Sequence, residues 1–218
     1  MALSFPLSLA DFFDGLRIQV AQMAPSEPRQ IDRTASGTIL TASLGEAIWR
    51  GTIQIKSQTF ASNPFAIEAK LSLLDRAGSS FLLYDPRKCY PHSDPDGSLI
   101  SGYSPQVASL GSNNRDMSLK GLPSGYVLTA GDLIGWTYGS SPTRYALHRL
   151  VSGATANGSG VTGTFEVAPF IHPGVAVNDA VTLVKPVIKA VLVPNPQYGG
   201  GRAKVMPGAS FDFVQTLD

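Results

Sequence analysis

Apolar and polar side chains alternate most regularly over residues 49–56, where Trp49, Ile53 and Ile55 lie on one side. A period of two residues is typical of a strand with one buried face. The same alternation predicts a strand over residues 16–20, and apolar runs predict further strands at residues 80–84, 187–193, 203–206 and 210–214. The longer predicted strands therefore lie toward the two ends of the chain.

Two segments have helical spacing instead. In the first, Ser8 and Asp11 form a pattern like a capping box, in which a hydroxyl and a later acid satisfy free backbone N–H groups at a helix start. Apolar side chains then recur at helical intervals, at Leu9, Phe12, Phe13 and Leu16. This pattern predicts a short helix before the first strand.

The second helical segment is predicted to begin at Asn63-Pro64. Asparagine is favoured at the cap and proline at the first helical position, where its missing N–H would have no partner. Gly78 is a natural stop for this helix. The predicted buried stripe consists of Ile67, Leu71 and Leu74.

From residue 85 onward the chain becomes richer in turns, and Asp94-Pro95-Asp96-Gly97 is a turn signal. Gly131-Asp132 and Asn157-Gly158 are typical of hairpin turns that need a positive φ. Short strands are predicted at residues 126–128, 132–136, 143–151, 161–167 and 180–185. This spacing favours a small closed β-barrel.

The change from longer strands at the two ends to short strands and turns in the middle predicts two units, with the second inserted into the first. The outer unit comprises residues 1–90 and 187–218, and the inner unit comprises residues 91–186. Prolines mark both joints, as expected of a linker that the chain passes twice. The expected fold class is therefore mainly β, with a helix-bearing outer unit and an inserted small barrel.

Composition narrows the function classes. Lysine and arginine total 17 against 16 aspartates and glutamates, whereas a dedicated nucleic-acid-binding protein normally has a basic excess. The single cysteine, Cys89, excludes an intramolecular disulfide framework and a multi-thiolate zinc site. No stretch approaches the roughly 18 apolar residues of a membrane span, and residues 1–15 lack the pattern of a signal peptide. We expect a soluble chain with no specific nucleic-acid partner and no membrane partner.

The histidines were weighed as candidates for chemistry. His92, Asp94 and Asp96 form an H-x-D-x-D pattern, for which a turn is favoured over a metal site because the other ligands of a calcium loop are missing. His148 occupies an alternating strand position without a neighbouring carboxylate, so we expect it to be packed or solvated rather than catalytic. His172 precedes a Pro-Gly pair and is expected in a loop.

No pattern identifies a nucleophile or a pair of catalytic acids. The chain has no G-x-S-x-G elbow, Cys89 lies in no activating motif, and the histidines carry no triad signature. The acids Asp75, Asp85, Asp132 and Glu166 are not linked by any pattern, as a glycoside hydrolase would require. We predict no enzyme activity, no catalytic or metal-binding residue, and no cofactor.

Two further motifs are weak. Gly199-Gly200-Gly201-Arg202 superficially resembles a phosphate-binding loop, but it lacks the P-loop spacing and the strand-to-helix context. A mobile hairpin loop, which could order against a neighbouring subunit, is favoured there. Asn157-Gly158-Ser159 has the form of a glycosylation acceptor, but without a secretory signal it is predicted to be only a turn.

Aromatic residues gather in the inner unit. Trp136, Tyr138 and Tyr145 form one group, with Tyr103 and Tyr126 upstream. We favour a role in filling the barrel, and the alternative is an exposed platform that stacks on sugars or bases.

The order of these features resembles that of the distal tail proteins of long-tailed bacteriophages. The matching segments cover most of the chain and carry weight through their order and spacing. They are Trp49, the helix at residues 64–77, Phe81-Leu82-Leu83-Tyr84-Asp85-Pro86, Pro91, Gly97, Leu128-Thr129-Ala130-Gly131-Asp132, Ala146-Leu147-His148-Arg149-Leu150-Val151, the turn at residues 157–160, Val167-Ala168-Pro169, Asp179-Ala180-Val181 and Phe211-Asp212-Phe213.

The resemblance implies a structural virion component without an active site. Distal tail proteins form a hexameric ring that joins the tail tube to the baseplate hub or tail tip. It implies that a β-sandwich with one α-helix builds the ring and that an inserted OB-like β-barrel projects from the periphery. The implied partners are further copies of the chain in a homo-hexamer, the tail tube protein and the hub or tip protein. A host-surface glycan is a further candidate partner, and the implied location is the phage tail, made in the host cytoplasm.

The alternative function is a monomeric carbohydrate-binding module. It would use Trp136, Tyr138 and Tyr145 as its sugar platform. The two functions differ in what they require of these side chains, because a platform must be exposed.

Overall fold

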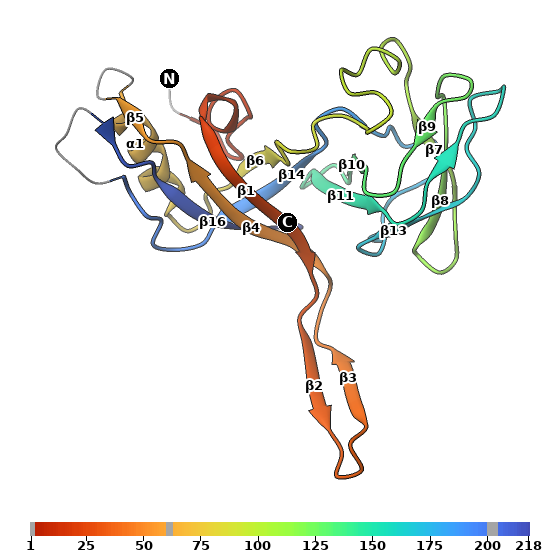
Figure 1. The fold of residues 1–218 in the computed structure, drawn as a ribbon, viewed down its shortest axis with the longest axis horizontal. Helices are drawn as coiled ribbons and strands as arrows, with labels where there is room; N and C mark the ends of the chain where they lie inside the picture. The colour runs from red at the N-terminus through yellow and green to blue at the C-terminus, as the bar shows by residue number, and fades with distance from the viewer. Residues whose placement is uncertain (1–2, 60–62, 200–204) are drawn as a thin grey trace.

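The computed structural model describes residues 3–59, 63–199 and 205–218. Within them the fold is mainly β, with one short α-helix and two curled antiparallel sheets of five strands each (Figure 1). The first sheet has the order β1 (Ile18–Ser26), β4 (Ile48–Ile55), β16 (Ser210–Gln215), β14 (Val187–Leu192) and β6 (Phe81–Tyr84). The second has the order β10 (Leu133–Tyr138), β11 (Arg144–Leu150), β13 (Phe165–Ala168), β8 (Asp116–Lys120) and β7 (Gln106–Leu110).

Shorter elements surround the two sheets. The helix α1 spans Phe65–Leu74, and a single 3-10 turn, η1, spans Phe13–Gly15. Three pairs of strands stand apart from the large sheets: β2 (Arg29–Arg33) with β3 (Ile39–Ser43), β5 (Gln58–Thr59) with β15 (Val205–Met206), and β9 (Val127–Leu128) with β12 (Ala154–Thr155).

The core of the first sheet is rich in aromatic rings. Phe81 of β6 meets Phe12 edge to face, with the ring centroids 5.2 Å apart, and also contacts Phe211 of β16. From α1, Leu71 and Leu74 enter the same core. Burial of such side chains is the main favourable contribution to folding, at about 1.5–3 kcal/mol each. The sheet is therefore held by α1 and by the segment before β1.

The second sheet curls around its own core. Its buried side chains include Val107, Met117, Leu119, Ile134, Trp136, Leu150, Phe165 and Val167. Burial is continuous over much of the central strands: three consecutive residues are buried in β8 and in β11, and five of the six residues of β10 are buried. Strand β10 is covered on both faces because it lies at the joint with the first sheet.

The two sheets contact each other through buried groups. Trp49 of β4 donates its indole N–H to the carbonyl of Leu147 on β11, at 2.6 Å. The Gln215 amide of β16 accepts from the Trp49 backbone N–H and donates to the Tyr145 carbonyl, each at 3.0 Å. Leu147 also packs into the core of the first sheet. The joint is therefore an ordered interface rather than a loose linker.

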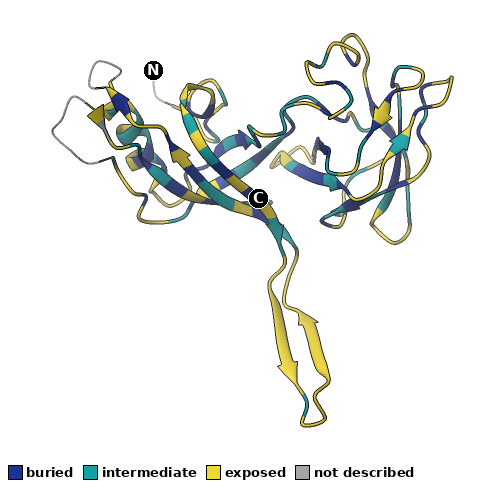
Figure 2. Ribbon diagram, viewed as in Figure 1, coloured by how far each residue is buried: buried dark blue, intermediate teal, exposed yellow. Residues whose placement is uncertain are grey.

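A two-stranded ribbon, β2–β3, projects from the first sheet as an arm (Figure 1). It continues the β1–β4 pair beyond Ser26 and Ile48. Every residue of both strands is exposed (Figure 2). At the tip, the backbone N–H groups of Thr34 and Gly37 close the turn, and Gly37 has a φ of +88°, which favours glycine. The arm has no core of its own.

Most predicted strands near the ends of the chain are confirmed. The segments 49–56, 80–84, 187–193 and 210–214 correspond to β4, β6, β14 and β16. Packing requires a glycine at position 51 of β4, because a Cβ there would lie 1.8 Å from the carbonyl oxygen of Gln22 on β1. The predicted strand 203–206 is seen only as β15, because residues 203 and 204 lie outside the described residues.

The first predicted helix is wrong in extent. The cap contacts do form, since the Asp11 backbone N–H donates to the Ser8 hydroxyl at 3.1 Å. However, the Asp14 N–H bonds to the Leu9 carbonyl, five residues back, so the turns are irregular and only η1 is regular. Burying both Phe12 and Phe13 in the same core takes precedence over helical geometry.

The second helix is confirmed, but its cap is wrong by one residue. Pro64 occupies the cap position, and Asn63 precedes it with a φ of +50°. Leu71 and Leu74 are buried as predicted, whereas Ile67 is only half-buried. The helix ends at Leu74, before Gly78.

In the middle of the chain, four of the predicted strands form and one does not. The segments 126–128, 132–136, 143–151 and 161–167 correspond to β9, β10, β11 and the shorter β13. The segment 180–185 is not a strand, since it makes only isolated bridges, such as that of Thr182 to Gly135. In the 157–160 turn the positive φ belongs to Gly160 rather than to Gly158. The arm, β7, β8 and β12 were not predicted, and the division at residues 90/91 and 186/187 stays a prediction.

Candidate interaction surface

The buried acids serve as supports for loops. Asp94 is 1% exposed, and its carboxylate accepts the backbone N–H groups of Leu99 and Ile100 at 3.1 and 3.0 Å. Asp132 accepts the N–H groups of His92 and Thr129 at 2.9 and 2.8 Å. The predicted turn around H-x-D-x-D is therefore confirmed. The Asp94 and Asp132 carboxylates accept hydrogen bonds from backbone N–H groups, and in this way they hold the loops in place.

Asp85 is likewise engaged. Its carboxylate forms an ion pair with Arg87, at 2.8 Å to the guanidinium. Asp75 is exposed at the end of α1, and Glu166 is half-buried on β13. Cys89 is half-buried, and burial raises the pKa of its thiol, which disfavours the nucleophilic thiolate.

His148 is packed inside the second sheet. Its ring stacks on Trp136 with the centroids 4.5 Å apart, and its Nδ1 lies 2.9 Å from the Pro169 carbonyl oxygen. Burial lowers the pKa of His148 to about 3, so the ring is neutral at physiological pH. The expectation of a packed histidine is confirmed. His172 lies in a loop, as predicted, and is only 8% exposed.

The aromatic residues between positions 126 and 138 belong to the core of the second sheet. Trp136 is 4% exposed and Tyr138 is 7% exposed, so neither can present a face to a sugar. Tyr126 is also buried, with its hydroxyl 3.3 Å from an Asp94 oxygen. The sugar platform of Trp136, Tyr138 and Tyr145 is therefore wrong, because two of its three rings belong to the core.

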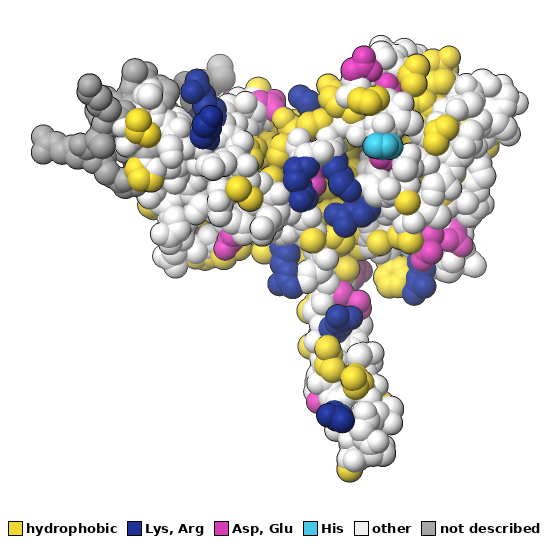
Figure 3. Space-filling view, in the orientation of Figure 1, with side chains coloured by type: hydrophobic (Ala, Val, Ile, Leu, Met, Phe, Trp, Pro, Cys, Tyr) yellow, Lys and Arg dark blue, Asp and Glu magenta, His cyan; other side chains and the backbone are white. Residues whose placement is uncertain are grey.

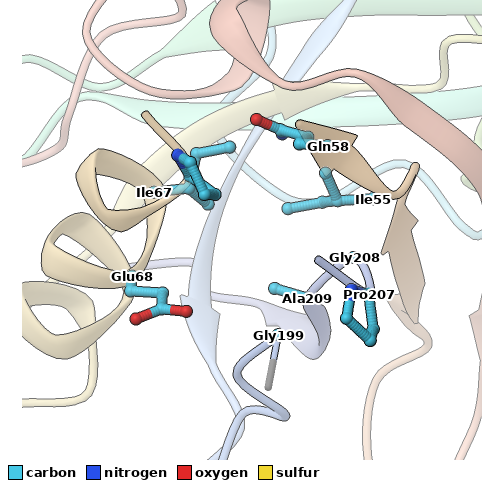
Figure 4. A pocket seen from close by; sticks show the side chains of 9 residues that line it. Ile55, Gln58, Ile67, Glu68, Gly199, Pro207, Gly208 and Ala209 are labelled. Atoms are coloured by element: carbon cyan, nitrogen blue, oxygen red, sulfur yellow. The ribbon is translucent and has the colours of Figure 1, made fainter. Parts of the chain in front are cut away.

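A small pocket lies between α1 and the end of the first sheet (Figure 4). Ile67 and Glu68 of α1 face Ile55, Pro207 and Gly208 across it. Its volume is about 10 Å³, which is too little for a ligand larger than a water molecule. A Cβ on Gly208 would lie 1.6 Å from the Ile55 carbonyl oxygen, so the pocket reflects a close approach of two backbones.

Residues 3–59, 63–199 and 205–218 contain no group of three histidine, cysteine or acidic side chains placed to hold a metal ion. Within the same residues, no helix is long and apolar enough to cross a membrane. The glycine loop predicted at residues 199–202 lies outside the described residues, apart from Gly199.

The arm is the most unusual surface of the molecule. Ile31, Ile39 and Leu40 are 57%, 64% and 55% exposed, and Leu44 at its base is 66% exposed. Figure 3 shows hydrophobic and cationic side chains side by side along it. A two-stranded ribbon is at best marginally stable alone in water, and exposed backbone edges with apolar side chains favour pairing with another chain. The arm has the features of an interaction element, and no helical or strand periodicity pointed to it.

A close polar contact links the base of the arm to the second sheet's loops. The Glu46 carboxylate lies 3.0 Å from the Nδ1 of His172. Glu46 stands between β3 and β4, and His172 follows β13. This contact and the Trp49 bond hold the root of the arm against the rest of the molecule.

No protein-family model matches the chain, and no curated protein matches it significantly.

Proposed function

We propose that the chain is a structural subunit of a long-tailed bacteriophage tail, which assembles into a six-membered ring between the tail tube and the baseplate hub or tail tip. The proposal starts from the resemblance of the ordered sequence segments to distal tail proteins. In it, the first sheet with α1 is the ring-forming β-sandwich, residues 1–90 and 187–218. The second sheet belongs to an inserted OB-like barrel, residues 91–186, at the periphery.

The observation that carries the proposal is the arm. All ten residues of β2 and β3 are exposed, although three of them are large aliphatic side chains. A monomeric protein gains nothing from such a ribbon and risks aggregation through its edges. An assembly subunit gains an extended contact that a neighbour can cover. The buried carboxylates of Asp94 and Asp132 and the Nδ1 atom of His148, by contrast, are occupied by structural contacts.

The assembly state tests the proposal directly. Light-scattering mass and negative-stain imaging of the purified chain are measured over a range of concentrations. Six copies of the 23.0 kDa chain have a mass of about 138 kDa, and a ring with a central hole is expected. A 23.0 kDa monomer at every concentration, also when the tail tube protein is added, would contradict the proposal.

Variants of the arm test whether the arm makes the contact between subunits. Ile31→Ser with Ile39→Ser is expected to raise the midpoint concentration for assembly at least tenfold, which corresponds to about 1.4 kcal/mol. Neither side chain touches a core, so the unfolding temperature should stay within a few degrees. The matched control is Val151→Ser with Val177→Ser, which removes exposed aliphatic side chains (52% and 49%) outside the arm. Equal effects of the two pairs would exclude the arm as the contact.

A further inference from the structure

A groove separates the root of the arm from the second sheet. Two adjoining depressions of about 290 and 480 Å³ form it, and they share Glu27, Ala47 and Phe170 as lining residues. We call this the arm groove and define it by these three residues with Arg115, Glu166 and Glu46. Figure 3 shows acidic side chains where the arm joins the body. The groove is open and of a size that fits side chains of another chain.

The floor of the arm groove is apolar and firmly held. Phe170 is 48% exposed, and the Arg115 guanidinium lies over its ring at 4.6 Å from the centroid. The backbone around Phe170 is anchored on both sides, since Ile171 donates to the Asn114 carbonyl at 2.8 Å and Val167 donates to the Arg115 carbonyl at 2.9 Å. A fixed aromatic ring left half in water is typical of an interface anchor.

The walls of the groove are acidic. Glu27, Glu46 and Glu166 line it, against the single cation Arg115. Glu27 is exposed and Glu166 is half-buried, while Glu46 already contacts His172. The groove therefore carries excess negative charge beside an apolar floor, and it suits an occupant with positive charge and aliphatic side chains.

One face of the arm has that chemistry. In the β2–β3 register, Arg29 pairs with Ser43, Ile31 with Thr41 and Arg33 with Ile39. Directly paired residues share a face and alternate residues along a strand return to it, so these six lie together. This face, which we call the cationic face, has two guanidinium groups, two isoleucines and no acid. The one acid of the two strands, Asp32, lies on the opposite face, where it accepts from the Gln30 amide at 2.8 Å.

From this complementarity we infer that the arm groove of one copy receives the cationic face of the arm of a second copy. The inference rests on the proposed function, because it requires self-assembly. The outer part of the arm projects away from both sheets, so it is free to reach another copy (Figure 1). The isoleucines pack on Phe170, and Arg29 and Arg33 approach the groove carboxylates. Only Ser43, at the root of the arm, belongs to the cationic face and also lines the groove. The rest of the face is a different surface, so the contact is head-to-tail, and a repeated head-to-tail contact closes into a ring when its rotation permits.

A charge exchange tests the inference. One variant carries Arg29→Glu and Arg33→Glu, a second carries Glu27→Lys and Glu166→Lys, and a third combines all four changes. Each of the first two places like charges in contact and is expected to raise the midpoint concentration for assembly at least tenfold. The third restores opposite charges in every copy and should recover most of the loss. The matched control is Arg17→Glu with Lys56→Glu, two exposed cations of the body.

The outcomes separate the inference from the proposed function. A wild-type ring whose assembly the charge changes leave unaltered, or whose loss the combined variant does not recover, would overturn the arm–groove contact and leave the ring intact. A wild-type chain that never assembles would overturn both. Circular dichroism of each variant shows that the fold is retained, so that loss of assembly is not a loss of structure.

Cross-linking gives a second, independent measurement. The substitutions Ile39→Cys and Ala47→Cys, in a Cys89→Ser chain, place one thiol on the cationic face and one in the arm groove. Mild oxidation is expected to give a ladder of disulfide-linked oligomers at concentrations where the ring forms. A product that stays monomeric under those conditions would overturn the inference.

Discussion

His148 is a neutral ring held in one orientation. A carbonyl oxygen only accepts, so the contact with Pro169 requires Nδ1 to carry the proton. The other nitrogen, Nε2, is buried and has no hydrogen-bond partner among the described residues. Protonating it would place a charge between Trp136 and its neighbours, with His172 6.2 Å away. The stack therefore stabilises the fold only while the ring is uncharged.

The free energy of unfolding should therefore depend on pH through His148. Its pKa is about 3 in the folded chain and close to the ordinary 6.5 when unfolded. Between these values the unfolded chain binds the extra proton, so stability is greatest above pH 6.5 and decreases as the pH falls toward 3. The slope from this residue reaches about 1.4 kcal/mol per pH unit. Urea unfolding at several pH values measures it.

His148→Asn isolates this contribution. An asparagine amide can still donate to the Pro169 carbonyl but does not titrate, so the slope should decrease by about one proton even though the lost stacking lowers stability overall. His92→Asn is the matched control, because it replaces a histidine at an exposed position. An unchanged slope in His148→Asn would contradict the assignment.

At the scale of elements, the arm should differ most between free and assembled chains. Trypsin cleaves after exposed arginines, and Arg29 and Arg33 both lie on strands without core contacts. In dilute monomer we expect rapid cleavage at these two sites, with the rest of the body resistant for longer. In assembled chain both sites should be protected at least tenfold. Mass spectrometry of the fragments measures the two rates, and equal rates would show that the arm is not covered.

The elements that the sequence predicted are those that pack on a core. Trp49, Ile53 and Ile55 alternate because β4 has one buried face, and Leu71 and Leu74 recur at helical spacing because α1 lies on that face. The arm has no buried face, so its apolar residues Ile31 and Ile39 fit no period. The groove could not be predicted either, since it unites residues near position 27 with residues near position 170.

At the scale of the whole molecule, one amide joins the two sheets. Gln215 is 4% exposed and satisfies a backbone donor on β4 and a backbone acceptor on β11. Arg149 of β11 also lies over the Trp49 ring, at 5.2 Å. These contacts of Gln215 and Arg149 connect the two sheets at the joint. The two cores should therefore unfold together only while the contacts are intact.

Replacing this amide should uncouple the sheets. Gln215→Ala leaves the buried Trp49 N–H and the half-buried Tyr145 carbonyl without this partner, which costs about 2–4 kcal/mol in total. We expect a lower midpoint in urea and a separation of the tryptophan-fluorescence and circular-dichroism transitions. Gln19→Ala, at an exposed position of β1, is the matched control. An unchanged, coincident transition would show that the joint does not depend on Gln215.

The continuity of the arm with β1 and β4 makes its length adjustable. Two residues added to each strand would lengthen the ribbon by about 7 Å and keep every later side chain on its original face. One residue added to each would turn Arg33 and Ile39 to the other side. Only insertions in even steps therefore keep the outer part of the cationic face on its original side. A series of such chains would act as a molecular ruler, in which the spacing between neighbours follows the number of added pairs.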